Sequence, residues 1–264
     1  MNNSLEKRPL ILITNDDGDA AKGIHVLTKL MMQLGDVVVV APDGPRSGQS
    51  NALTVYKPIR YKKLEEREGL TRYSSNGTPT DCVKLAVNEV LDRKPDLVVS
   101  GINHGSNAAI NVIYSGTMGA ALEGCENSIP SIGFSLCDFM PDADFSAFEP
   151  YIVEIAKQVL ENGLPEGICL NVNAPQSDIK GIKVARQCAG HWTQEFAPAM
   201  DPRGKSYYWL TGHFVNHEPE SEDTDEWALK HGYISVVPTK IDLTAHEYLS
   251  ELTVQMEKTS VQAN

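Results

Sequence analysis

Two neighbouring carboxylates, Asp16 and Asp17, come just after the apolar stretch LILIT (10–14). Like charges a few Å apart disfavour joint ionisation, so a cation or a positive dipole is needed to stabilise such a pair. A solvated acidic turn is the simpler interpretation of these residues alone, because Asp-Gly is a common turn dipeptide. Residues elsewhere in the chain decide between the two interpretations.

Polar side chains also follow two other apolar stretches, DVVVVAP (36–42) and PDLVVSG (95–101). The loops after these stretches carry hydroxyl and amide groups at four positions: Ser47, Asn51, Asn103 and Asn107. Carboxylate, hydroxyl and amide oxygens are hard ligands that suit Mg²⁺, Mn²⁺ or Ca²⁺. Each of these residues also has an ordinary role in a loop, but their joint placement after successive strands favours a metal site.

The stretch YSGTMGAALEG (114–124) predicts a helix that begins near Ser115, Gly116 and Thr117. The first N–H groups of a helix lack intrahelical acceptors and bind phosphate readily. Ordinary helix capping is the alternative, because Ser and Thr are good N-caps. A phosphate site beside a divalent cation is typical of enzymes that hydrolyse phosphate esters.

These residues must be positioned by the elements around them. Apolar stretches that predict buried strands alternate with patterns that predict helices. The strands are expected at 10–14, 36–42, 95–101, 129–136 and 167–175, and the helices at 23–35, 76–91, 115–127 and 148–163. This alternation predicts a doubly wound, mostly parallel α/β sheet of the Rossmann-like kind. In such sheets ligands collect at the carboxyl ends of the strands, where the strand order reverses.

The rest of the chain has a weaker pattern. An exposed strand or ribbon is expected at 55–66, where Pro58 interrupts it. We expect residues 1–180 to form the Rossmann-like core with the metal and phosphate site. Residues 181–264 are expected to be a C-terminal continuation of the same structural domain, with a protruding β element used in oligomerisation and a terminal helix. Strands are expected at IKVARQ (182–187), SYYWLTGHFV (206–215) and GYISVVP (232–238).

Composition excludes several classes of partner. The chain has 264 residues and a net charge of −12, which argues against binding nucleic acid polymers or anionic membranes. No apolar stretch approaches the ~20 residues of a membrane span. The five cysteines form no CxxC pair, and the N-terminal apolar run is too short for a signal peptide. A cytoplasmic protein is therefore expected.

Several motifs, taken together in their order along the chain, resemble those of one known family. They are TNDDG (14–18), APDGPRSGQSNALT (41–54), NGTPTDCV (76–83), SGINHGSN (100–107), YSGTMGAALEG (114–124) and, more weakly, DTDEWALKHGYISVVP (223–238). With these motifs the chain resembles the SurE family of survival-protein nucleotidases, which act on nucleoside 5′- and 3′-monophosphates. The motifs cover nearly the whole chain.

The resemblance implies one divalent cation per subunit, Mg²⁺ or Mn²⁺, and four ligands: Asp16, Asp17, Ser47 and Asn103. It also implies a homodimer or homotetramer in which C-terminal extensions are exchanged between subunits. The chain departs from the family pattern at Gly44-Pro45 and Ala109. Both departures lie beside the implied metal site, so they concern substrate preference more than activity.

The expected reaction is hydrolysis of a nucleoside monophosphate to nucleoside and phosphate. Water activated by the cation is the preferred nucleophile, and Asp16 is the alternative as base or attacking carboxylate. Five residues are expected to bind the phosphate or the substrate: Asn51, Asn107, Ser115, Gly116 and Thr117. His104 could protonate the leaving oxygen, although a histidine at the edge of the site is the simpler interpretation. Trp192 and the stretch 207–209 could stack on a base, although packing in a core or interface is the better explanation.

Three other functions compete with this interpretation. A haloacid-dehalogenase-type phosphatase is suggested by the D-x-D of Asp17-Gly18-Asp19, but Ala21 stands where that chemistry needs Thr or Val. A receiver-like signalling domain also carries an acidic pair, but it needs an Asp at the end of the third strand, where this chain has SGIN (100–103). A nucleotide or phosphate sensor without turnover is the third.

Overall fold

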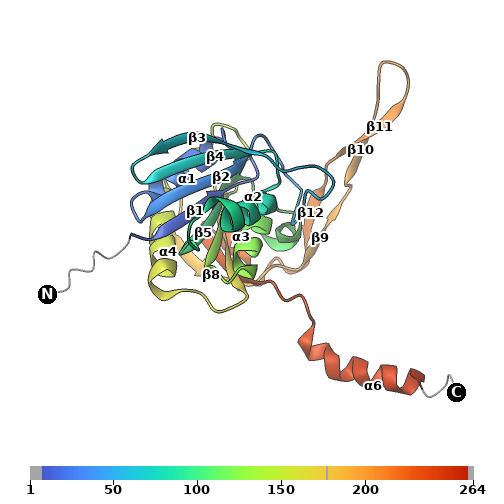
Figure 1. Cartoon of the computed structure of the whole chain (residues 1–264). Coiled ribbons are helices and arrows are strands. Elements are labelled where there is room, and N and C mark those ends of the chain that lie inside the picture. The colour runs from blue at the N-terminus through green and yellow to red at the C-terminus, as the bar shows by residue number, and fades with distance from the viewer. Residues whose placement is uncertain (1–7, 177, 261–264) are drawn as a thin grey trace.

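The computed structural model describes residues 8–176 and 178–260. Within this part of the chain, nine strands form one central sheet (Figure 1). In sheet order they are β3 (Tyr61–Arg67), β4 (Leu70–Ser75), β2 (Asp36–Pro42), β1 (Leu10–Thr14), β5 (Leu97–His104), β6 (Ser131–Leu136), β7 (Ile168–Ala174), β13 (Tyr233–Lys240) and β8 (Gly181–Val184).

The sheet is mostly parallel. Every neighbouring pair from β4 to β7 is parallel, while β3 pairs with β4, and β13 with β7, in antiparallel fashion. The chain builds the sheet from β1 towards β2 and then returns to add β5 on the other side of β1, so the strand order reverses between β1 and β5. This arrangement confirms the predicted doubly wound α/β fold.

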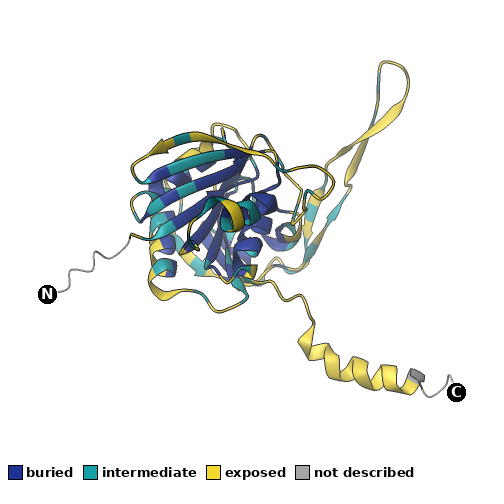
Figure 2. Ribbon diagram, viewed as in Figure 1, coloured by how far each residue is buried: buried dark blue, intermediate teal, exposed yellow. Residues whose placement is uncertain are grey.

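Helices cover both faces of the sheet. Helices α1 (Lys22–Met31) and α4 (Glu149–Asn162) pack on one face, and their apolar side chains join Ile11, Val99 and Phe134 in the larger core cluster. Helices α2 (Pro79–Leu85) and α3 (Gly116–Glu126) pack on the other face, where Leu12 and Val98 lie. Alternate residues of a strand point to opposite faces, so Ile11 and Leu12 belong to different layers. Figure 2 shows the resulting buried centre.

The start of α2 follows from its sequence. Thr78 accepts a hydrogen bond from the backbone N–H of Asp81, and the Asp81 side chain accepts one from the N–H of Thr78, which forms a capping box. Pro79 takes the first helical position, where its missing N–H costs nothing. Thr78 and Pro79 are local signals of a helix start in the sequence, whereas the return bond of Asp81 is seen only in the structure. The helix continues into a short π-helical turn, η1 (Ala86–Val90).

A long β arm protrudes from the body (Figure 1). We call the two ribbons formed by its four strands the arm: β9 (Gly190–Thr193) pairs with β12 (His213–Asn216), and β10 (Phe196–Met200) pairs with β11 (Ser206–Leu210). The chain then forms α5 (Asp225–Lys230), β13, the 3₁₀ helix η3 (His246–Tyr248) and α6 (Leu249–Ser260). Helix α6 stands away from the body and is exposed (Figure 2). The protruding element and the terminal helix were predicted.

Several elements differ from the prediction, and the strands β9 and β10 of the arm were not predicted. The ribbon expected at 55–66 begins only at Tyr61, after Pro58, and its partner β4 was not predicted. The sequence of β4, LTRYSS, lacks a strong apolar alternation, and three of its side chains are half-buried although the strand lies inside the sheet between β2 and β3. The strand expected at 206–215 is interrupted at Thr211 and Gly212, where Gly212 has a φ of +131°. No helix in the described part of the chain is both long and apolar enough to span a membrane.

Candidate active site

The predicted site residues gather at the carboxyl edge of the sheet, where the strand order reverses. Thr14 of β1 lies opposite Ser100 of β5 in the parallel register, so the residues that follow both strands leave the sheet side by side. The Asn15 side chain closes the turn after β1: its Nδ2 donates to the Gly18 carbonyl at 3.0 Å, and the Gly18 N–H donates to its Oδ1 at 3.2 Å. This turn fixes the backbone that carries Asp16 and Asp17.

Asp16 packs against the first turn of α3. Its side chain is 4% exposed, and its Oδ1 accepts a hydrogen bond of 2.6 Å from the Thr117 hydroxyl. A Cβ on Gly116 would lie 2.8 Å from Asp16 Cβ and 3.0 Å from its Oδ2, so only glycine allows this close approach. Burial raises the pKa of Asp16 to about 6; the bond from Thr117 opposes this rise and the charge of Asp17 adds to it.

A bond between His104 and Asp17 joins the end of β5 to the turn after β1, next to Asn103. The backbone N–H of His104 donates to Asp17 Oδ2 at 3.4 Å. Burial raises the pKa of Asp17, and the neighbouring His104 lowers it. Asn103 is buried, and its Nδ2 donates to the Gly105 carbonyl at 2.8 Å. No hydrogen bond from the described residues engages Asn103 Oδ1, the atom that could bind a cation.

The loop after β2 is hydrogen-bonded both to the turn after β1 and to Tyr114, just before α3. The Arg46 N–H donates to the Asp16 carbonyl at 2.6 Å, and the Ser50 N–H donates to the Tyr114 carbonyl at 3.1 Å. Ser47 follows Arg46 on an exposed turn, and no hydrogen bond within the described residues fixes its hydroxyl. Asn51 is exposed. It lies beside α3, since a Cβ added to Gly119 would be 2.7 Å from Asn51 Oδ1. The backbone therefore brings the Ser47 loop to the site.

Asn107 lies in a buried network of amides. Its N–H donates to Asn173 Oδ1 and its carbonyl accepts from Asn171 Nδ2, both at 2.8 Å. One hydrogen of its own amide goes to the Ser135 hydroxyl at 2.9 Å. Asn171 and Asn173 were not predicted as functional residues. Two asparagines inside the buried strand ICLNVNA nevertheless indicate a polar network, because buried amides need hydrogen-bond partners.

The start of α3 is as predicted. Ser115 is the N-cap, and its Oγ accepts a hydrogen bond of 3.0 Å from the Met118 N–H. Gly116 and Thr117 then form the first turn, in which N–H groups have no intrahelical acceptor. The Thr117 hydroxyl, however, is engaged with Asp16 rather than being open to a ligand.

A family model described as "Survival protein SurE" matches residues 11–194 of the chain. This is well over half of the sequence and includes all the residues described above. The chain belongs to the SurE family.

Relatives and a solved structure agree with this membership. A Bacteroides fragilis protein named 5′-nucleotidase SurE is 56% identical over 247 residues, which cover 93% of this chain and 97% of that protein. A protein of the same name from Flavobacterium psychrophilum is 55% identical over 249 residues, with coverages of 93% and 96%. The crystal structure of the SurE protein from Aquifex aeolicus has a TM-score of 0.81 and 38% identity, and the match covers 94% of this chain and all of that one.

SurE membership implies a divalent cation, and the donor set at the site fits one. The described residues contain no cluster of three or more His, Cys, Asp or Glu side chains that could hold a metal ion. The site instead offers two partly desolvated carboxylates and neutral oxygens, which are hard ligands. A cation beside Asp16 and Asp17 would offset the burial and the mutual repulsion that raise the pKa of Asp16.

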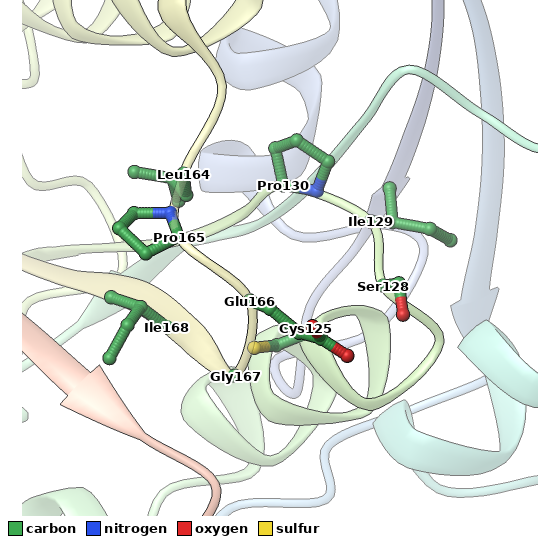
Figure 3. A pocket seen from close by; sticks show the side chains of 9 residues that line it. All are labelled: Cys125, Ser128, Ile129, Pro130, Leu164, Pro165, Glu166, Gly167 and Ile168. Carbon is green, nitrogen blue, oxygen red and sulfur yellow. The ribbon is translucent and has the colours of Figure 1, made fainter.

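A separate hollow lies far from these residues. It has a volume of about 340 Å³ and is shown in Figure 3. Ile129 and Pro130, which precede β6, and Gly167, which precedes β7, line it together with Cys125 near the end of α3. These are the amino ends of the strands, so this hollow is at the opposite edge of the sheet from Asp16.

Proposed function

We propose that the chain hydrolyses nucleoside 5′- and 3′-monophosphates to nucleoside and phosphate. The observation that carries the proposal is the placement of Asp16 and Asp17 after β1, beside Asn103 and His104 at the end of the neighbouring β5, with Asp16 bonded to the first turn of α3. Relatives named 5′-nucleotidase SurE at 56% and 55% identity support it. This family membership favours the SurE type of chemistry over a haloacid-dehalogenase-type phosphatase or a receiver domain.

Asp16, Asp17, Ser47 and Asn103 are the proposed ligands of one Mg²⁺ or Mn²⁺ ion. Their oxygens are the donor type that both cations prefer. When bound, the cation offsets the negative charge that develops on the phosphoryl group and makes a water more acidic. Asp16 is the alternative as base or attacking carboxylate, although a bound cation would lower the pKa that burial raises and so make the carboxylate a weaker base.

The remaining groups orient the substrate. The Gly116 N–H is proposed to donate to a phosphoryl oxygen, and the dipole of α3 favours the negative charge. The Thr117 N–H, which also bonds to the Asp16 carboxylate, is proposed to share in this contact. Ser115, Asn51 and the second amide hydrogen of Asn107 are proposed to add neutral donors. His104 Nδ1 lies 2.9 Å from the Met140 carbonyl, which can only accept, so Nδ1 carries the proton. Its Nε2 then remains for the leaving oxygen when the ring is doubly protonated.

The test is release of phosphate from a panel of nucleoside monophosphates by the purified chain, across titrations of Mn²⁺ and Mg²⁺. Asp17→Asn and Asn103→Ala should each lower the rate by about a hundredfold or more without loss of secondary structure. Asp19→Asn is the matched control, because a haloacid-dehalogenase mechanism needs that carboxylate and the proposed site does not. Near-normal turnover of AMP by Asp17→Asn would refute the site, and absence of turnover in the parent chain would favour a sensor.

We also propose that the chain forms a homodimer or homotetramer in the cytoplasm. Large apolar side chains are exposed on the arm, at Trp209 and Leu210, and on α6, at Leu249, Val254 and Met256. Such clusters mark contacts between subunits. Light scattering with Trp209→Ser and Val254→Glu variants tests this, because a monomeric parent chain would contradict it. Within the described residues all five cysteines are unpaired, which suits a reducing compartment.

A further inference from the structure

A hollow opens where the arm joins the body. The arm is two ribbons in series, and the pairing stops between them at Gln194–Glu195 on one side and Thr211–Gly212 on the other. Gln194 has a φ of +53° and Gly212 one of +131°, while a single backbone bond of 2.9 Å from Thr211 N–H to the Glu195 carbonyl crosses the break. The hollow beside this break has a volume of about 570 Å³. This lies within the usual range for small-molecule sites, about 300–1,000 Å³.

One wall of this hollow belongs to the phosphate end of the site. Asn111 and Tyr114 line it from the body, in and just after the 3₁₀ helix η2 (Ala109–Ile113). Tyr114 directly precedes Ser115, the N-cap of α3, and the Ser115 N–H donates to the Asn111 carbonyl at 3.1 Å. A ligand with its phosphate at the start of α3 would therefore have this hollow next to it.

The other wall presents a fixed aromatic ring. Trp192 of β9 is half-buried, and its Nε1 donates to Asn111 Oδ1 at 2.8 Å. Phe214 meets the indole edge-on, with ring centroids 6.2 Å apart. A Cβ on Gly212 would lie 3.1 Å from Trp192 Cε3, so the missing side chain of Gly212 leaves room for the ring. Tyr114 is 53% exposed on the facing wall.

We propose that this hollow binds the nucleobase of the substrate, with Trp192 and Tyr114 as its aromatic walls. The inference rests on the proposed function, since it names where the base of the same nucleoside monophosphate lies. Two aromatic side chains beside a phosphate site suit a planar, weakly polar group, and stacking on an aromatic side chain tolerates any base. The sequence singled out Trp192 as a candidate for stacking, and the structure adds its neighbours.

The experiment compares ligands with and without a base. Initial rates are measured with AMP and with ribose 5-phosphate at saturating Mn²⁺, and adenosine and inorganic phosphate are titrated as inhibitors of AMP hydrolysis. For Trp192→Leu we expect KM for AMP and the inhibition constant of adenosine to rise by at least about fivefold, the ratio that about 1 kcal/mol of stacking corresponds to. The inhibition constant of phosphate, and the rate with ribose 5-phosphate, should change by less than about twofold. Tyr114→Leu should act in the same direction.

Two further variants separate stacking from structure. Trp192→Phe keeps an aromatic face but loses the indole N–H, so it should retain most of the affinity for adenosine. Trp227→Leu is the matched control, since Trp227 lies on α5 outside the hollow. Equal changes for adenosine and phosphate in Trp192→Leu, or no change for either, would overturn the base site while hydrolysis of AMP by the parent chain still upheld the proposed function. No hydrolysis of AMP by the parent chain would remove both.

Discussion

Thr117 Oγ1 donates a hydrogen bond of 2.6 Å to Asp16 Oδ1, across 101 residues of sequence. The bond joins the first turn of α3, the proposed phosphate site, to the end of β1, the proposed metal site. It also favours the ionised form of a carboxylate whose pKa burial raises. One side chain therefore links the position of the helix to the charge of a proposed metal ligand.

Replacing Thr117 should weaken binding of the cation. Thr117→Val removes a hydrogen bond to a buried carboxylate, which raises the pKa of Asp16 further and makes the proton a stronger competitor of the metal. A hydrogen bond to a charged group contributes about 1.5–3 kcal/mol, so we expect the affinity for Mn²⁺ at pH 7 to fall by about tenfold or more. Calorimetric titration of Mn²⁺ measures this, and Thr117→Ser, which keeps the hydroxyl, should bind like the parent chain. Equal affinity in Thr117→Val and the parent would contradict the coupling.

Asp16 should destabilise the metal-free protein at neutral pH. Its pKa rises on folding from the ordinary 3.8 to about 6, so the folded state holds the proton more tightly than the unfolded state. Binding of this proton stabilises the folded state fully below pH 3.8. The free energy of unfolding then falls by about 3 kcal/mol as the pH rises through 6 and the proton is lost. In the presence of a chelator, Asp16→Asn should therefore unfold at a higher temperature than the parent chain at pH 7.5, with no advantage near pH 3.5.

Adding Mn²⁺ should reverse that order. Binding stabilises only the chain that holds the cation, so the parent should gain thermal stability and Asp16→Asn should not. Asp19→Asn provides the control, since Asp19 is a half-buried neighbour on the same turn. If Asp16→Asn were no more stable than the parent in chelator at pH 7.5, the carboxylate would not be the desolvated group described here.

The sequence predicted the strands and helices that place the site, but it did not predict the contacts made there. Buried strands such as 10–14 and 36–42 are continuous apolar runs, and the N-cap residues Thr78 and Ser115 indicate where their helices begin. These are local signals. The bond between Thr117 and Asp16, by contrast, depends on how α3 packs on β5 and β6 beside the end of β1, which no local pattern encodes.

The break in the arm and the strand β4 were missed for a related reason. Thr211 and Gly212 lie inside a run with good strand propensity, and the positive φ of Gly212, together with that of Gln194 on the paired side, interrupts the pairing there. β4 is defined by its partners β2 and β3 rather than by its own alternation. The sequence therefore predicts the strands, the helices and the set of polar residues near the site. Which side chains bond to one another across these elements is seen only in the structure.

Gly116 should be intolerant of even a methyl group. An alanine Cβ would lie 2.8 Å from Asp16 Cβ and 3.0 Å from Oδ2, so Asp16 or the helix must shift. Alanine is the better helix former, by about 1 kcal/mol, so Gly116→Ala need not unfold the chain. We expect a loss of about a hundredfold in the rate of AMP hydrolysis, because a misplacement of about 1 Å at an active site has that effect. Gly44→Ala, in a loop where the added Cβ meets nothing within 4 Å, should remain active.

The buried amides on β7 should hold the segment that follows β5 and carries Asn107, close to Asn103 at the end of that strand. Asn173 Oδ1 accepts from the Asn107 N–H, and its Nδ2 donates to Asn171 Oδ1, both at 2.8 Å. Asn173→Leu leaves both partners buried without a bond, and each such group costs about 1–3 kcal/mol, so we expect the free energy of unfolding to fall by about 2 kcal/mol or more. The loosened loop should also raise the concentration of Mn²⁺ needed for half-maximal activity. Urea unfolding and a Mn²⁺ titration of AMP hydrolysis measure the two effects.

Asn162→Leu, at an exposed amide that ends α4, is the control and should change neither. A stable Asn173→Leu with the parent's Mn²⁺ requirement would show that the network does not position the site.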